Sequence, residues 1–318
     1  MSNSTRTVDA QEFRIALAPT VQVLRDFTAA IDQGGPRHGD LPWTGSPAMG
    51  EINDEQTYRR RSCWEHPATD SHNLGALSLR AASDYVRTFA AAFDTDKAPL
   101  YGHLVLARSA LEACVVTSWL SEVGITSLER IKRGLSEYVY SATEVARLKL
   151  RDDADGTVRW WVGVADSFGW AVTDRQRNAW SQKRRGKPLV DGVGRPSVAD
   201  GITRLVIDDA ASRQIGNLLW SRLSAVSHVT WFGLHTALQL PSEDTSSGDF
   251  VTVPVGSDSS VVSGHAFFIL KALRRAATSR FTLMGWNDQQ WKADCRRVEA
   301  NELALLRAYE AGLPGDAD

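Results

Sequence analysis

Apolar residues recur every three or four positions over most of the chain. In residues 9–32, for example, Phe13, Leu17, Val21 and Leu24 share one face of a predicted helix, because about 3.6 residues complete each turn. Later segments keep this period, without a strand–helix–strand alternation and without a repeat of fixed length. Together these patterns predict helices at residues 9–32, 71–93, 99–122, 126–151, 157–170, 197–207, 209–238, 260–284 and 287–311.

Boundary signals agree with this helical pattern. Thr126 to Glu129 (TSLE) matches the capping box that opens a helix. The one strand-like stretch, FVTVPV at 250–255, contains Pro254, which favours an edge strand or an extended loop. The predicted fold class is therefore all-α, with residues 1–318 forming a single helical bundle of about eight or nine helices.

Two connections, residues 33–70 and 172–196, are long and contain many glycines and prolines. Connections longer than about 12–15 residues are usually functional or disordered, and disordered segments rarely carry tryptophan. Because Trp43 and Trp64 lie in the first and Trp180 in the second, we interpret both as ordered and residues 33–70 as a lid-like loop.

The second connection is basic. Residues 173–195 carry seven basic residues against two acidic ones, a net charge of +5. Such residues around Trp180 could follow a phosphate backbone while the indole stacks on a base, although a solvated surface loop explains the same composition. The GVGRP stretch at 192–196 is not a phosphate loop, because no GK[ST] follows it and no predicted strand precedes it.

The segment LVLARSALEACVVTSWLS at 104–121 is apolar or small on every face, which is typical of a buried helix. Arg108 and Glu112 carry its charges, and their spacing of four places them side by side. One interpretation is a guanidinium preorganised for an anionic substrate, with Glu112 orienting it or acting as acid or base. The alternative is a buried structural ion pair.

A second group of polar residues lies in WSRLSAVSHVTWFGLH at 220–235. His228 could act as a general base with the Ser224 hydroxyl one turn below it; the alternative is a core histidine with a satisfied hydrogen bond. At helical spacing, one stripe contains Ser221, Ser224, His228, Trp231 and His235.

Candidate metal ligands are few. Cys63, His66 and His72 supply three donors without a clear fourth. His228 and His235 lie about 10 Å apart along a helix, too far to share one zinc ion. No Glu-x-x-His pair supports a di-metal bundle, and no nucleotide or flavin motif is visible. We therefore expect neither a metal nor a cofactor.

Arg222 and His228 form an Arg-x5-His pattern that resembles the motif of HEPN ribonucleases, helical nucleases of toxin and defence systems. Leu223 follows the arginine, where that family favours a polar residue. The resemblance implies that Arg222 stabilises a phosphate, that His228 moves a proton, and that two motifs meet across a dimer. It makes a HEPN-like ribonuclease or toxin the alternative function, with nucleic acid as its partner.

A broader resemblance is to uncharacterised helical bacterial proteins that pair an ARSALEA helix with a later LSAVSH helix. These correspond to Ala107–Ala113 and Leu223–His228. The resemblance implies an all-α architecture without specifying chemistry. It also suggests that Arg108, Glu112 and His228 belong to one site.

Composition indicates the class of protein and its cellular environment. The net charge is −2, with 43% hydrophobic and 23% charged residues, as in ordinary globular proteins. The three widely spaced cysteines form no CxxC pair. No run of about 18 apolar residues could span a bilayer, and the N-terminus has no apolar signal core. We expect a soluble cytoplasmic protein with no membrane partner.

The leading hypothesis is a metal-free, cofactor-independent enzyme that acts on a small anionic substrate by elimination, cyclisation or hydrolysis, as in specialised metabolism. Arg108 would hold the anion, Glu112 would orient it, and His228 would act as acid or base. The pocket would lie between helices 99–122 and 209–238 under the lid. Predicted substrate-binding residues are Arg222, Ser224, Trp231, His235, Asp54 and Tyr58. The partner, besides the substrate, would be a second copy of the chain or a small protein. A non-catalytic helical binding protein is a further alternative function.

Overall fold

The computed structural model describes residues 10–39, 41–94, 99, 101–149, 153–174, 187–207, 214–228 and 259–311. Its elements, in chain order, are α1 (Ala10–Arg37), α2 (Pro47–Asn53), α3 (Glu55–Arg59), α4 (Pro67–Ala91), α5 (Gly102–Leu120), α6 (Ser127–Arg147), α7 (Ala154–Ser167), β1 (Val172–Asp174), β2 (Pro188–Val190), α8 (Val198–Val206), α9 (Gln214–Ser227), α11 (Ser259–Met284) and α12 (Gln289–Ala311). The predicted all-α fold class is confirmed.

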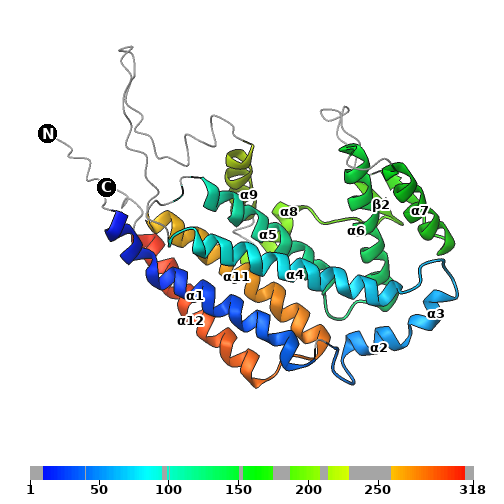
Figure 1. The fold of residues 1–318 in the computed structure, drawn as a ribbon, viewed down its shortest axis with the longest axis horizontal. Helices are drawn as coiled ribbons and strands as arrows, with labels where there is room; N and C mark the ends of the chain where they lie inside the picture. Colours follow the sequence, from blue (N-terminus) through cyan, green and yellow to red (C-terminus); the bar gives the residue numbers. More distant parts are fainter. Residues whose placement is uncertain are drawn as a thin grey trace, which may run out of the picture.

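The long helices α1, α4, α5, α11 and α12 run lengthwise through the molecule, and α6 and α7 stand at one end of them (Figure 1). Helix α4 contacts α1, α5, α6 and α11. Its first turns belong to a smaller hydrophobic core around Trp64, Ile131 and Leu135, whereas its later turns belong to the main core. The helix therefore connects the two cores.

The strands form a short antiparallel pair beside α6. Val172 pairs with Val190 and Thr173 with Leu189. This hairpin adds Val190 to the smaller core. The strand-like stretch at 250–255 lies outside the described residues.

Local signals explain where several helices begin. The Thr126 hydroxyl accepts the amide of Glu129 at 3.1 Å, so the predicted capping box opens α6. Ser46 caps α2 in the same way through the amide of Met49, with Pro47 in the first turn.

The segment 33–70, predicted as a lid-like loop, is largely helical. Helix α1 continues to Arg37, α2 and α3 follow, and α4 begins at Pro67. The glycines near the end of α1 do not break the helix. Gly34 lies against the Phe281 ring, and a Cβ atom at this position would overlap that ring. Close packing thus explains this glycine better than turn formation does.

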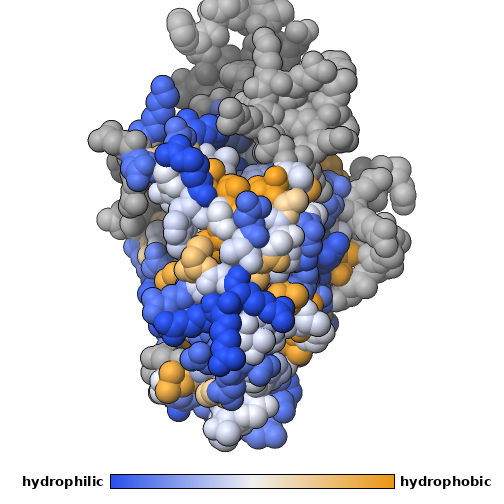
Figure 2. Space-filling view, turned by 90° about the vertical axis from the view of Figure 1, so that its right-hand side faces the viewer, coloured by the Kyte–Doolittle hydropathy of each residue, from blue (hydrophilic) through white to orange (hydrophobic). Residues whose placement is uncertain are grey.

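The molecular surface at the end of the bundle is mixed. Figure 2 faces this end and shows apolar patches separated by hydrophilic side chains, without one continuous apolar face. No helix within the described ranges combines the length and the apolar content needed to cross a membrane.

The crossing of α4 and α6 yields a stability prediction. A Cβ atom on the buried Gly134 would lie 2.8 Å from the Ser71 Cβ and 3.2 Å from the Ser71 Cα, which cannot easily move. We expect Gly134→Ala to lower the free energy of unfolding by about 1–3 kcal/mol, measured by urea denaturation. The control is the exposed Gly163 in α7, whose Cβ would meet nothing within 4 Å. Gly163→Ala should be neutral or stabilising by up to about 1 kcal/mol, and equal destabilisation by both changes would contradict the packing explanation.

Candidate functional site

A pocket of about 900 Å³ opens between α1, α4 and the end of α11. His72 and Arg280 are among its lining residues, although both nitrogens of His72 and the Nε and Nη1 atoms of Arg280 are themselves buried. The connection after α1 closes one side of it: the indole N–H of Trp286 donates to the Leu41 carbonyl at 2.8 Å, and the Trp43 amide donates to the Met284 carbonyl at 2.9 Å. The apolar part of the wall includes Ile31, Leu41, Pro42, Ile52, Phe281, Met284 and Trp286.

A buried ionic cluster lies behind this wall. Arg130 donates from Nε to Glu51 Oε2 at 2.7 Å, and its other nitrogens donate to the carbonyls of Leu120 at 2.5 Å and Glu122 at 2.9 Å. His72 Nε2 lies 3.2 Å from the same Glu51 oxygen. Burial alone would raise the pKa of Glu51, but His72 and Arg130 outweigh it and lower that pKa. Glu51 is therefore an anion held between two partners.

Arg280 is the exceptional member of this neighbourhood. Its residue is 3% exposed, yet among the described residues neither Nε nor Nη1 has a hydrogen-bond partner. Burial lowers its pKa to about 9, and the nearby positive charge of Arg130 acts in the same direction, against Glu51. Arg280 packs against Gly75 of α4, where a Cβ would lie 3.6 Å from Nη1, an ordinary contact distance. The Ser121 hydroxyl, 3.0 Å from that same Cβ position, is also unpartnered.

The charges of this cluster do not cancel. Burial is the largest cause that lowers the pKa of His72, and the positive charges of Arg280 and Arg130 contribute, against the opposing effect of Glu51. His72 is therefore neutral at pH 7. The two positive charges of Arg130 and Arg280 then face only one negative charge, the carboxylate of Glu51. The wall of the pocket thus carries one uncompensated buried positive charge.

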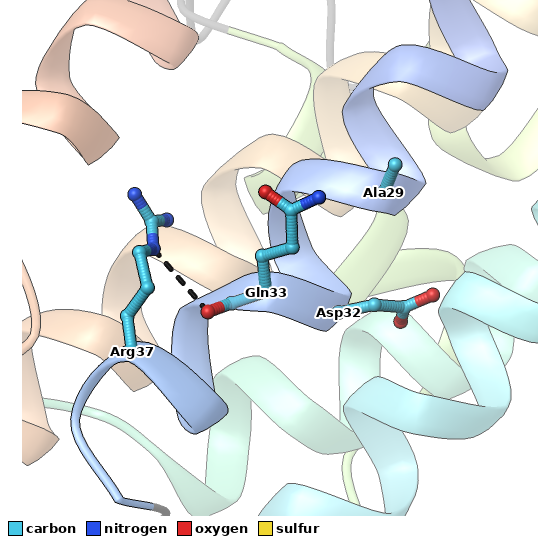
Figure 3. Close-up of a pocket in the computed structure, with 4 residues that line it drawn as sticks. All are labelled: Ala29, Asp32, Gln33 and Arg37. Atoms are coloured by element: carbon cyan, nitrogen blue, oxygen red, sulfur yellow. Dashed lines mark hydrogen bonds between the residues drawn. The ribbon is translucent and has the colours of Figure 1, made fainter.

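A second hollow of about 620 Å³ lies on the surface of α1 (Figure 3). All four lining residues, Ala29, Asp32, Gln33 and Arg37, come from this one helix. Arg37 donates to the Gln33 carbonyl at 3.2 Å, and Asp32 accepts from Arg87 at 2.6 Å. Its charged groups already have partners, so this hollow lacks the features of a site.

The predicted side-by-side pair of Arg108 and Glu112 is wrong as an ion pair. Glu112 Oε1 accepts from Arg195 Nη2 at 3.2 Å, and Arg195 also approaches Glu137 at 3.6 Å. The Arg108 guanidinium instead lies over the Trp220 ring, 4.7 Å from its centroid. Spacing along one helix made the two residues neighbours, but side chains from other elements supplied better partners.

The sequence predicted that His228 shares one site with these residues. It is exposed just beyond the end of α9, and its amide donates to the Ser224 carbonyl at 3.0 Å. Arg222 and Ser224 are half-buried on α9. Trp231 and His235 lie outside the described residues. The catalytic and ribonuclease roles assigned to these residues stay predictions.

The segment 33–70, predicted to cover a pocket between helices 99–122 and 209–238, instead lines the pocket between α1, α4 and α11. Asp54 is exposed between α2 and α3, whereas Tyr58 packs against the smaller core. Neither lines the pocket. The segment contributes Leu41, Pro42 and Ile52 to the pocket at α1, α4 and α11, not to one between α5 and α9.

The candidate metal ligands do not converge. Cys63 is exposed and His66 lies at the start of α4, whereas His72 is buried against Glu51. No group of three or more His, Cys, Asp or Glu residues that could hold a metal occurs in the part of the chain that the structure describes.

Sequence reasoning missed Glu51, Arg130 and Arg280. Arg280 did have a recognisable signal, because it stands on the apolar face of α11 between Ala277 and Met284, at a core position. A charged residue at such a position is costly unless it is paired and hydrogen-bonded, so its presence there was a signal. Glu51 and Arg130 come from different helices and had no comparable local signal.

Comparison of the chain with protein-family models, with curated proteins and with solved structures gives no match. The assignment of a function therefore rests on the geometry of the pocket.

Proposed function

We propose that the protein is an enzyme that binds a small anionic molecule in the pocket between α1, α4 and α11. Arg280 receives the anion, and His72, positioned by Glu51, serves as the acid/base residue. The observation that carries this proposal is the buried Arg280 in the pocket lining, whose Nε and Nη1 have no hydrogen-bond partner among the described residues. The proposal keeps the substrate class and the acid/base chemistry expected from the sequence but moves them to different residues.

The energetic argument starts from the cost of burying charge. An uncompensated charge inside a protein costs several kcal/mol, and natural chains usually pair or remove it. Arg280 is kept at a position where a leucine or methionine would pack with its apolar neighbours. A bound anion would supply the missing charge and accept hydrogen bonds from the free guanidinium nitrogens. Binding of an anion would therefore offset the unfavourable free energy of the buried charge.

His72 has the properties of a general base. Nε2 lies 3.2 Å from the Glu51 carboxylate, and a proton on Nε2 would leave Nδ1 as the basic nitrogen; neither ring nitrogen makes a well-oriented hydrogen bond within the described residues. A neutral imidazole held by a carboxylate can take up a proton and keep it as an imidazolium. A bound anion nearby would raise the pKa of His72 by stabilising that charged form.

The test is isothermal titration calorimetry with acetate, benzoate and inorganic phosphate. We expect at least one of these anions to bind the wild-type protein. Arg280→Met should weaken that binding roughly 10- to 100-fold while leaving the thermal unfolding midpoint unchanged or higher. Arg80→Met is the matched control, because Arg80 lines the same pocket but is exposed at its rim; its binding should change less than about threefold.

The acid/base role has its own readout. Binding near pH 6 should be coupled to proton uptake, seen as a dependence of the measured enthalpy on the ionisation enthalpy of the buffer. His72→Gln should retain the anion but lose the proton uptake. Anion binding that is equally tight in Arg280→Met would overturn the assignment of the pocket, and unchanged proton uptake in His72→Gln would overturn the role of His72.

A further inference from the structure

We infer that the ligand is an apolar carboxylic acid, bound as a monoanion with its carboxylate at Arg280 and its hydrocarbon body along the pocket. This inference rests on the proposed function and narrows it from anions in general to one chemical class. Three features of the pocket support it: the charge balance, the apolar wall and the length of the α4 face.

The charge balance selects a monoanion. Arg130 is already paired with Glu51 and two backbone carbonyls, whereas Nε and Nη1 of Arg280 have no hydrogen-bond partner in the part of the chain that the structure describes. A carboxylate neutralises a single guanidinium, whereas a phosphate monoester dianion would bring one buried negative charge too many. The exposed rim does not change this balance, since Arg87 there is paired with Asp32 at 2.6 Å.

The wall beside Arg280 is apolar. Phe281 follows it directly and Met284 lies one turn further along α11, with Trp286 just beyond. Trp286 and Phe281 contact each other edge to face, with ring centroids 5.6 Å apart. Such surfaces stabilise a hydrocarbon or an aryl group by removing its area from water. A small hydrophilic anion would leave them without a ligand contact.

The pocket is long enough for such a body. Its lining on α4 extends from Thr69 to Arg87, and the part between His72 and Arg87 is about 22 Å long at a rise of about 1.5 Å per residue. Between these two ends the lining on α4 combines the apolar Ala76, Leu77 and Leu79 with the polar Asn73, Arg80 and Asp84. A ligand with its head at His72 and Arg280 can therefore extend its body along this helix toward the rim.

The test compares four probes on the full chain by thermal shift and calorimetry: 4-phenylbutanoate, its neutral amide, acetate and inorganic phosphate. We expect 4-phenylbutanoate to bind at least tenfold more tightly than the other three probes. Arg280→Met should remove its advantage over the amide. Ile52→Ala should weaken 4-phenylbutanoate without affecting acetate, because Ile52 belongs to the apolar wall. The control is Arg147→Met, because Arg147 is an exposed residue of α6 that does not line the pocket.

The outcomes separate this inference from the proposed function. If phosphate or acetate binds through Arg280 and 4-phenylbutanoate has no advantage, the ligand class is wrong and the anion pocket stands. Equal binding of the amide and the acid would overturn the role of charge. If none of the four probes responds to Arg280→Met in a folded variant, both proposals fall.

Discussion

Replacing Glu51 with glutamine is expected to lower the free energy of unfolding by about 3–5 kcal/mol. The side chain keeps its size, but the carboxylate between His72 and Arg130 is lost. Two buried guanidinium groups, Arg130 and Arg280, then lack a counter-charge, although Arg130 keeps its two carbonyl acceptors. Urea denaturation followed by circular dichroism measures the change.

A double-mutant cycle shows whether charge is the cause. Adding Arg280→Met to Glu51→Gln removes one of the two stranded cations, so the double variant should recover about 1–3 kcal/mol. Glu65→Gln is the matched control on an exposed ion pair with Arg59, and its effect should stay below about 1 kcal/mol. If the cycle shows no coupling between Glu51 and Arg280, the two groups do not share one electrostatic site.

The protein is expected to lose stability steeply as the pH falls below about 6.5, because several buried histidines must charge on unfolding. Burial lowers the pKa of His103 to about 4 and that of His265 to about 3. Their rings lie 6.1 Å apart, and the positive charge of Arg222 acts on His265 in the same direction as burial. Both are neutral in the folded protein across a range in which the unfolded chain binds protons.

The sign follows from proton binding. Between the folded pKa and 6.5 the unfolded state holds more protons, so stability is complete above about pH 6.5 and decreases as the pH falls. Each such histidine contributes a slope that approaches about 1.4 kcal/mol per pH unit. The free energy of unfolding, measured in urea from pH 7 to pH 4.5, should therefore fall with a slope that His265→Gln reduces by about that amount.

His228 provides the comparison for the acid prediction, since it is exposed at the end of α9. His228→Gln should leave the pH dependence as it is in the wild type. A His265→Gln profile that keeps the wild-type slope would show that this buried histidine does not control the acid sensitivity.

The hydrophobic period of the sequence located the helices well, because helix formation depends on residues three and four positions apart. The periods at 71–93 and 260–284 correspond to α4 and α11 within a few residues. The capping box at Thr126 even placed the start of α6. Gly34 was misleading about where the first helix ends. It favoured a loop, but it lies within α1 and leaves space for the ring of Phe281 from another helix.

The sequence by itself determined the all-α class, the positions of most helices and the presence of charged residues on apolar faces, because these depend on local spacing. The tertiary structure alone decided which charges meet. Glu112 pairs with Arg195 across 83 positions, and Glu51 pairs with Arg130 across 79. Arg280 has no such ion pair within the described ranges of the chain. Ion pairing depends on distances in space, which the packing of helices sets, and local spacing carries no information about side chains that arrive from another helix.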